Sequence, residues 1–237
     1  MGEGMPNDAL IMPYISSANI ACGAHAGDIA TMQTTVASAI EHGVAIGAHP
    51  GFNDKQHFGR TEMQLSSAEI YALITEQVFA LQKIAANMGT RLKHVKPHGA
   101  LYNMSARDPQ LAATIAKAVY DVDAALVLFG LSGSCSLTEA RKTGLQIAAE
   151  VFADRSYQDD GSLTPRSQPG ALITDTATSM QQVLQMVRDS VVTSINGNQV
   201  KIQADTICIH GDGAHALDFA KALYHTLETA SIGIGKK

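Results

Sequence analysis

The sequence predicts a parallel β/α fold, with a β/α barrel as the first choice and an open doubly wound sheet as the second. Short apolar runs alternate along the chain with amphipathic helix patterns, which indicates parallel strands joined by helical crossovers. The runs are apolar almost throughout, as expected for strands that are covered on both faces. A length of 237 residues suits a single domain of this class, so we expect one domain over residues 1–237.

The first half of the chain contains three predicted strand–loop–helix units. We expect strands at residues 17–21, 44–48 and 92–95, followed by loops at 22–28, 49–65 and 96–103. The first helix should run from about residue 28 to 42 and end at Gly43, because glycine readily takes the left-handed conformation after a helix. Residues 66–69, Ser-Ser-Ala-Glu, form a capping-box pattern for the second helix, which should end before Gly89. Asp108-Pro109 marks the third helix start.

The second half repeats the pattern with a longer loop. We expect strands at residues 125–129, 146–151 and 206–210, and helices near 136–144, 176–188 and 214–228. Residues 136–139, Ser-Leu-Thr-Glu, form a second capping-box pattern, and Gly144 should end that helix. After an apolar run at 191–195, Asn196-Gly197 predicts a hairpin with a type I′ turn.

Composition excludes several classes of protein. The net charge is −5, and Lys and Arg form no basic run, so nucleic acid is not an expected partner. Three cysteines without a close pair argue against a disulfide framework or a CxxC zinc site. We see no signal peptide and no apolar run long enough to cross a bilayer. We therefore expect a soluble, cytoplasmic protein that does not bind membranes.

Polar and charged residues with catalytic potential collect directly after the predicted strands. They are His25, Asp28, His49, Lys96, His98, Asp154, Arg155, His210 and Asp212. In a β/α barrel the loops after the strands form one face, where active sites lie. Each residue has a structural explanation by itself: a lone histidine is more often a hydrogen-bonded structural residue, and Asp28 is explained equally well as a helix cap. Their recurrence after five strands favours a shared site.

These residue types support proton transfer and stabilisation of anionic intermediates. Lysine and arginine side chains could hold a carboxylate or phosphate, the candidates being Lys96, Arg60, Arg155 and Arg166. The sequence contains no GxxxxGK[ST] loop and no GxGxxG after a strand, so ATP or NAD binding has no local signature. It also contains no GxSxG elbow and no HExxH pair.

Several long motifs closely resemble the LamB/YcsF family, and together they cover essentially the whole chain. They are Ser17-Ala-Asn-Ile-Ala-Cys-Gly-Ala-His-Ala-Gly-Asp28, Gly47-Ala-His-Pro50, Phe58-Gly-Arg60, His94-Val-Lys-Pro-His-Gly-Ala-Leu-Tyr-Asn103, Glu150-Val-Phe-Ala-Asp-Arg155, the stretch 160–166 and Cys208-Ile-His-Gly-Asp212. The resemblance implies a β/α barrel of the glycoside hydrolase/deacetylase type. Members of that family normally open with Asp-Leu-Asn-x-Asp-x-Gly-Glu, whereas this chain opens with Met1-Gly-Glu-Gly4, so we expect the barrel to lack its first strand.

The resemblance also implies a hydrolase acting on a cyclic amide. In that family, ATP-dependent 5-oxoprolinase converts 5-oxo-L-proline, ATP and water to L-glutamate, ADP and phosphate. The family member works with two partners, subunits B and C, and ATP is a co-substrate of the assembled enzyme. The partners largely phosphorylate the lactam, and the family member opens the activated ring.

From this resemblance we expect the following roles. His25 or His49 is the general base for water, Asp212 orients a histidine, and His98 or His210 protonates the ring nitrogen. Lys96 and Arg155 balance charge on the phosphorylated oxygen, and Asp154 belongs to the catalytic group. The expected substrate-binding residues are Asn19, Asp28, Arg60, Asn103, Arg155 and Arg166.

Two other functions compete with this one. A metal-dependent deacetylase or amidohydrolase would bind a divalent ion through His25, His49 and a carboxylate. A non-catalytic subunit would bind a small ligand or only support the B and C partners. The residues themselves do not indicate whether a metal binds.

Overall fold

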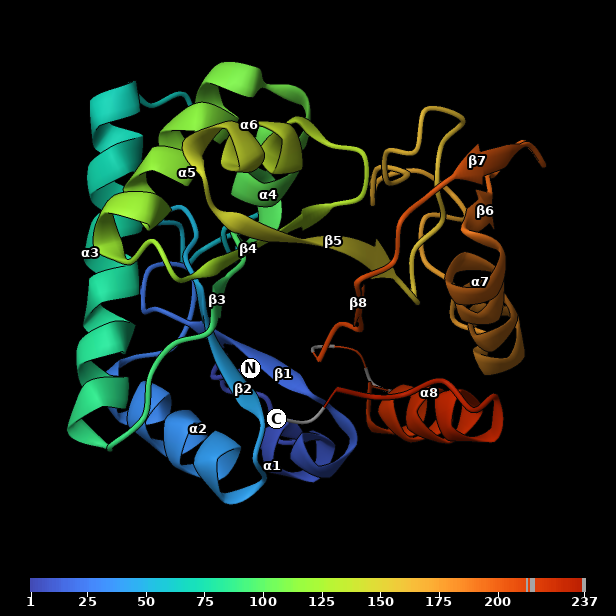
Figure 1. Cartoon of the computed structure of the whole chain (residues 1–237), viewed down its shortest axis with the longest axis horizontal. Coiled ribbons are helices and arrows are strands. Elements are labelled where there is room, and N and C mark those ends of the chain that lie inside the picture. The colour runs from blue at the N-terminus through green and yellow to red at the C-terminus, as the bar shows by residue number, and fades with distance from the viewer. Residues whose placement is uncertain (212, 214–215, 236–237) are drawn as a thin grey trace. The chain divides into compact units, whose positions relative to one another are not determined.

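The structure is a computed structural model that describes residues 1–211, 213 and 216–235. The chain divides into two compact units, and both have parallel strands with helical connections, so the predicted fold class is confirmed (Figure 1). The first unit comprises Met1–Gly130 and Ser134–Ile147 with Gly235. The second comprises Leu131–Gly133 and Ala148–Ile234.

The first unit is built on parallel strands in the order β1-β2-β3-β4. Their bounds are β1 Ser17–Ala21, β2 Ala45–His49, β3 His94–Val95 and β4 Val127–Leu131. Ala21 pairs with His49, and Ala48 pairs with Val95, so the carboxyl ends of β1, β2 and β3 lie at one edge. The loops after these strands therefore begin side by side, which places the candidate residues of three loops near one another.

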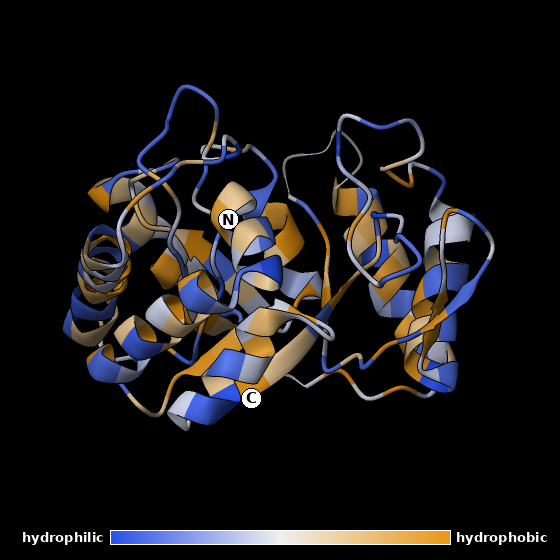
Figure 2. Cartoon of the chain, turned by 90° about the horizontal axis from the view of Figure 1, so that it is seen from above, coloured by the Kyte–Doolittle hydropathy of each residue, from blue (hydrophilic) through white to orange (hydrophobic). Residues whose placement is uncertain are grey.

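Helices cover the strands of the first unit. They are α1 Asp8–Ile11, the 3-10 helix η1 Met12–Tyr14, α2 Ile29–Glu41, α3 Ser67–Asn87, α4 Gly99–Arg107, α5 Pro109–Val122 and α6 Cys135–Thr143. Helix α3 packs beside α5, and α5 packs beside α6. The ribbons of the helices carry both hydrophobic and hydrophilic residues, as expected for amphipathic helices (Figure 2).

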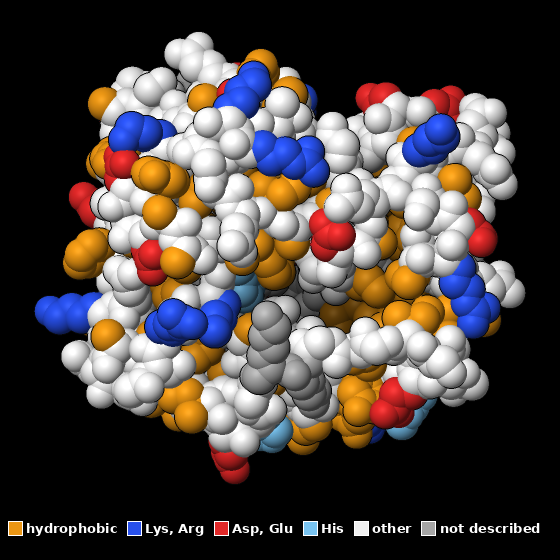
Figure 3. Space-filling view, in the orientation of Figure 1, with side chains coloured by type: hydrophobic (Ala, Val, Ile, Leu, Met, Phe, Trp, Pro, Cys, Tyr) orange, Lys and Arg blue, Asp and Glu red, His pale blue; other side chains and the backbone are white. Residues whose placement is uncertain are grey.

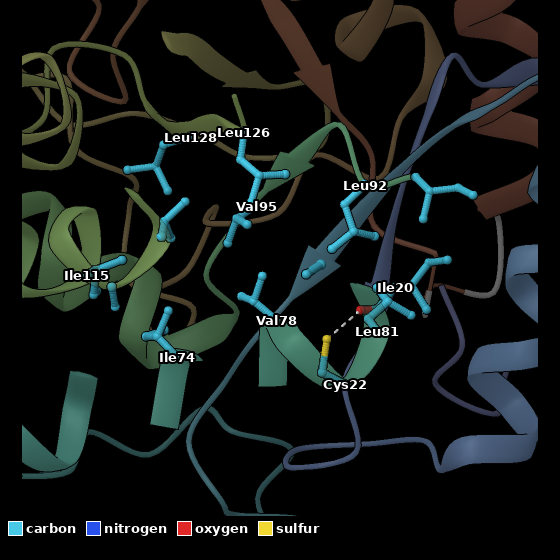
Figure 4. Close-up of a cluster of buried hydrophobic side chains, with 14 of the residues drawn as sticks. Ile20, Cys22, Ile74, Val78, Leu81, Leu92, Val95, Ile115, Leu126 and Leu128 are labelled. Carbon is cyan, nitrogen blue, oxygen red and sulfur yellow. Dashed lines mark hydrogen bonds between the residues drawn. The ribbon is translucent and has the colours of Figure 1, made fainter. Parts of the chain in front are cut away.

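The hydrophobic core of the first unit joins α3 to the strands. Ile74, Val78 and Leu81 of α3 are fully buried and belong to one cluster with Ile20 of β1 and Val95 of β3 (Figure 4). Shortening a buried leucine or isoleucine to alanine typically costs about 2–5 kcal/mol. This core therefore fixes the strand ends, and with them the loops that follow.

The second unit is smaller. Strand β5 Gln146–Phe152 pairs in parallel with β8 Thr206–Cys208. Helix α7 Thr176–Asp189 leads into an antiparallel hairpin of β6 Val191–Thr193 and β7 Gln199–Lys201, and α8 Ala216–Thr229 follows β8. The strand expected over residues 206–210 ends at Cys208, so His210 lies just beyond it.

Most predicted helix starts are confirmed by their capping hydrogen bonds. Asp28 caps α2 through the backbone N–H of Thr31. Ser66 and Glu69 form the expected capping box of α3. Asp108 caps α5. The second capping box is wrong: α6 begins at Cys135 with Ser134 as its N-cap residue. The hydroxyl of Ser136 instead donates to the buried hydroxyl of Ser105 at 2.9 Å.

Two loop predictions are also wrong. The loop expected over residues 96–103 ends early, because α4 begins at Gly99 and takes Asn103 into the helix. The turn at Asn196-Gly197 is not of type I′, because only Gly197 has a positive φ, at 85°. The Gly197 N–H donates to the Ser194 carbonyl at 2.9 Å, and the Ser194 N–H donates to the Asn198 carbonyl at 2.8 Å. The hairpin therefore has a three-residue loop that ends in a left-handed glycine.

Charged side chains are mixed over the surface. On the face seen in Figure 3, Lys and Arg side chains lie apart from one another among acidic, apolar and uncharged ones. Among the described residues, no helix combines the length and apolar character needed to cross a membrane.

Candidate active site

A histidine cluster, defined as His25, His49 and His98, lies where β1, β2 and β3 end. The rings of His25 and His98 stack with their centroids 3.8 Å apart, and the His49 ring meets that of His98 edge-on at 4.8 Å. All three side chains are buried. The structure therefore brings together three histidines that the sequence placed on separate loops.

Backbone carbonyls fix the ring orientation of two of these histidines. Nδ1 of His49 lies 2.7 Å from the carbonyl oxygen of Lys96, and Nε2 of His98 lies 2.8 Å from that of Phe58. A carbonyl oxygen only accepts, so each of these ring nitrogens donates its hydrogen. Phe58 has a φ of 56°, which is an unusual conformation for a bulky residue. In this conformation its carbonyl oxygen accepts the hydrogen bond from His98.

Glu3 joins the cluster, although the sequence pattern did not point to it. The N-terminal amine donates to the Asn19 carbonyl, and the Ala21 N–H donates to the Met1 carbonyl, both at 3.0 Å. These bonds hold the first residues along β1 and bring Oε1 of Glu3 within 3.3 Å of His25 Nε2. A signal was present, because Gly2-Glu3 matches the last two residues of the family's opening pattern.

The surroundings lower the pKa values of the Glu3 carboxyl group and of the His49 and His98 imidazoles in the cluster. Burial by itself would raise the pKa of Glu3, but the hydrogen bond from His25 and the nearby positive charges lower that pKa to about 2. Burial lowers the pKa of His98 to about 3, and it also lowers the pKa of His49 well below its ordinary value. The cluster therefore combines a carboxylate with at least two neutral imidazoles near neutral pH.

The remaining ring nitrogen of His25, Nδ1, lies against the backbone of Gly51. Nδ1 of His25 is buried and has no hydrogen-bond partner among the described residues. A Cβ added to Gly51 would lie 2.8 Å from this nitrogen, so glycine is needed there. The side chain of Gln77 fixes Gly51 by accepting from its N–H at 3.1 Å and donating to its carbonyl at 2.8 Å. Gln77 is a further residue that the sequence pattern did not reveal.

Two cationic side chains belong to the same unit. Lys96 is buried, and its Nζ lies 5.4 Å from the centroid of the Tyr102 ring. The guanidinium of Arg60 lies over the Phe58 ring at 4.9 Å, on an otherwise exposed side chain. Both contacts have cation–π geometry. Burial, followed by the charges of His98 and Lys96, lowers the pKa of His49.

Three other candidates of the first unit have different surroundings. Oδ1 of Asn19 contacts Nε2 of the buried His94 at 2.9 Å. The carboxylate of Asp28 is exposed and accepts from both the backbone N–H and the hydroxyl of Thr31, as a helix cap does. Asn103 is exposed on α4. Local capping therefore accounts for Asp28.

The second unit contains a separate histidine–carboxylate pair. Nδ1 of His210 lies 2.7 Å from Oδ2 of Asp154, and its backbone N–H contacts the same carboxylate at 3.3 Å. Burial opposes ionisation of Asp154, but its hydrogen bonds and the charge of His210 lower its pKa overall. Asp212, the expected orienting carboxylate, lies outside the described residues.

Both arginine candidates of this region also belong to the second unit. Arg155 is buried, and its guanidinium donates to the carbonyls of Ala171 and Thr164. Burial, followed by repulsion from Arg166, lowers the pKa of Arg155 to about 10. Arg166 is exposed. The contacts of Arg155 hold two loop segments together, which is a structural role.

One group of side chains in the described part of the chain has the arrangement of a metal site. Ligand atoms of Glu3, His49 and His98 all lie within 4.8 Å of one another. Histidine nitrogen and carboxylate oxygen are common ligands of zinc and related ions.

Comparisons with known proteins give a consistent result. The sequence model of the LamB/YcsF family matches residues 1–236. The chain is 54% identical over 239 residues to the A subunit of 5-oxoprolinase from Bordetella pertussis, covering 99% of this chain and 95% of that protein. It is 56% identical over 228 residues to the corresponding 5-oxoprolinase protein of Shouchella clausii, covering 96% and 90%. The crystal structure of the lactam utilization protein from Thermus thermophilus superposes with a TM-score of 0.93 at 42% identity, covering 100% of this chain and 97% of that one.

Proposed function

Because this chain belongs to the LamB/YcsF family, we propose that it is the A subunit of a 5-oxoprolinase and opens the ring of 5-oxo-L-proline. Relatives that are more than half identical are named as A subunits of 5-oxoprolinase, and a structural neighbour is a lactam utilization protein. These names support a hydrolase that works within a multi-subunit enzyme. We propose further that the other members are subunits B and C and that ATP is consumed by the assembled enzyme.

The observation that carries the proposal is the state of His25. Its Nε2 faces the Glu3 carboxylate at 3.3 Å, while its buried Nδ1 has no hydrogen-bond partner in the described part of the chain. A histidine that is oriented by a carboxylate and whose other nitrogen has no hydrogen-bond partner among the described residues has the chemistry to take a proton from water. Nδ1 of His49 donates to the Lys96 carbonyl and its Nε2 faces Nδ1 of His98, so His25 is the better candidate for the general base.

The chemistry requires an activated lactam, because an unstrained amide is a poor electrophile. Once the lactam oxygen carries a phosphoryl group from ATP, water adds to the ring carbon while Nδ1 of His25 takes its proton. The carbon–nitrogen bond then breaks, the nitrogen takes a proton, and a γ-acyl phosphate forms. A second water hydrolyses the acyl phosphate to L-glutamate and phosphate. Lys96 would balance the negative charge on the phosphorylated oxygen.

Subunits B and C would supply most of the phosphorylation. This division agrees with the absence of a phosphate-binding loop from the sequence. The ring nitrogen needs an acid, for which His98 and His210 were the sequence candidates. The pKa of His98, lowered to about 3 mainly by burial, makes it a weak proton carrier near neutral pH. His210, which pairs with Asp154 within the second unit, is the other sequence candidate for this acid.

The test is glutamate release from 5-oxo-L-proline and ATP by this chain combined with purified B and C subunits. His25→Gln should reduce turnover by at least about 100-fold, since general base catalysis contributes about 10²–10⁴. The matched control is His57→Gln, at an exposed histidine whose partner is Asp54. Full activity of B and C without this chain, or near wild-type turnover of a folded His25→Gln variant, would remove the proposal.

A further inference from the structure

We infer that Glu3, His49 and His98 together form a binding site for one divalent transition-metal ion, with zinc as the representative ion. The inference uses the same histidine cluster as the proposed function. It adds a bound ion, which the ring-opening proposal does not require. Ligand atoms of the three side chains lie within 4.8 Å of one another.

Two ring nitrogens of the cluster face each other directly. Nε2 of His49 and Nδ1 of His98 are 2.9 Å apart. Each ring already donates its one hydrogen to a backbone carbonyl, that of Lys96 for His49 and that of Phe58 for His98. In two neutral rings both facing nitrogens therefore present lone pairs. Two lone pairs at this distance repel each other unless a positive ion lies next to both.

The distance between these nitrogens also fits a shared ion. Zinc binds imidazole nitrogen at about 2.0–2.1 Å in tetrahedral geometry, so two nitrogens on one ion are about 3.3 Å apart. The observed 2.9 Å is a few tenths of an ångström shorter, so the two rings would move slightly apart around the ion. Oε1 of Glu3 lies 4.0 Å from Nδ1 of His98, near enough to become the third ligand after a small side-chain movement. Two histidines and one glutamate form a ligand set used by catalytic zinc sites, which keep a position open for water or substrate.

The surroundings of the ligands hold them in place. Histidines that bind a metal almost always donate their other N–H to a carbonyl or carboxylate, which fixes the ring and its tautomer. His49 and His98 both do so. The Glu3 carboxylate contacts His25 at 3.3 Å, so its orientation is also supported. A carboxylate supplies the negative charge that a cation needs in a buried position.

The experiment measures metal binding to the chain alone, without an affinity tag, partners or substrate. After removal of metal by a chelator, the chain is titrated with Zn²⁺ by calorimetry and with Co²⁺ by visible absorption. We expect about one ion per chain. Glu3→Gln and His98→Asn should each weaken binding by more than about 100-fold, since losing even a residue that only supports a metal ligand costs about 10–100-fold. The control His57→Gln should bind as the wild type does.

A second measurement uses only the wild-type chain, so it does not depend on the folding of any variant. X-ray absorption at the zinc edge should show imidazole and oxygen ligands and no sulfur. Sulfur ligation, absence of binding, or equal binding by folded Glu3→Gln and His98→Asn variants would overturn the inference. In the last two cases a proton shared by His49 and His98 would explain their contact. This experiment measures metal binding and not turnover. Absence of metal binding would therefore not contradict the ring-opening proposal, and loss of turnover in a variant would not contradict the metal-site proposal.

Discussion

Nε2 of His49 faces Nδ1 of His98 at 2.9 Å, although the two residues are 49 positions apart in the sequence. One ends β2 and the other precedes α4, and each ring is held by a carbonyl on the side away from the contact. A pair of histidines restrained in this way cannot relax by rotating either ring without losing its hydrogen bond to a backbone carbonyl. The geometry of the cluster is therefore set before any ligand arrives.

Gln77 should act as a positioning residue. Gln77→Leu removes the two bonds to Gly51 and leaves buried backbone groups unpaired, so we expect a loss of about 1–3 kcal/mol in the free energy of unfolding. Because Gly51 lies against Nδ1 of His25, kcat for glutamate release should fall more than KM changes. Urea unfolding and steady-state kinetics measure both effects. The control is Gln185→Leu, at a partly exposed side chain whose partner is Thr193. Unchanged kcat in a folded Gln77→Leu chain would contradict this role.

Asp28 should behave as a helix cap and not as a substrate ligand. Asp28→Ala should lower the free energy of unfolding by about 1 kcal/mol and leave KM for 5-oxo-L-proline unchanged. Asp175 provides a matched comparison, because it caps α7 through the N–H and hydroxyl of Thr178 in the same way. Asp175→Ala should give a similar loss of stability. A rise in KM for the Asp28 variant alone would restore the substrate-binding prediction.

His94 should make stability depend on pH. Burial, followed by the charge of Lys96, lowers the pKa of His94 to about 3, whereas an unfolded histidine titrates near its ordinary pKa of 6.5. Below pH 6.5 His94 is protonated in the unfolded chain but stays neutral in the folded chain. The free energy of unfolding therefore decreases as the pH falls. Between about pH 7 and 5.5 this single group should remove roughly 1 kcal/mol.

The corresponding variant is His94→Gln, compared with the wild type by urea unfolding at both pH values. The variant should lose less stability over this pH range than the wild type does, by that same rough amount. Only the change with pH is compared, and not the absolute stability, because Nε2 of His94 also contacts Asn19. Identical pH dependence in the two chains would show that His94 is not responsible.

Asp154 should support proton transfer by His210. Asp154→Asn keeps an oxygen that can accept from His210 but removes the charge that stabilises its protonated form. We expect turnover with B and C to fall by at least about 10-fold, a part of the ~10²–10⁴ that general acid catalysis contributes. Steady-state glutamate release measures this, and circular dichroism checks folding. An unchanged rate would exclude His210 as the proton donor.

Much of the site could be predicted from residue type and position. His25, His49, Lys96 and His98 follow successive parallel strands, and parallel strands end at one edge, so their proximity follows from the fold class. Glu3 and Gln77 could not be found in this way. Glu3 follows no predicted strand, and Gln77 lies inside a helix whose pattern indicated only packing. Their roles depend on contacts with residues 22 and 26 positions away, respectively.

The sequence by itself determined what is encoded within three or four residues: the caps at Asp28, Ser66 and Asp108, the left-handed end at Gly144, and the alternation of strands and helices. A local pattern gave a wrong prediction where a distant partner was available. Ser136 was predicted to cap a helix, but its hydroxyl donates to the hydroxyl of Ser105 instead. Only the tertiary structure decided which nitrogen of each histidine carries a hydrogen, because the carbonyls of Lys96 and Phe58 reach those rings from other segments. Such contacts arise from packing over long sequence separations, which no local pattern records.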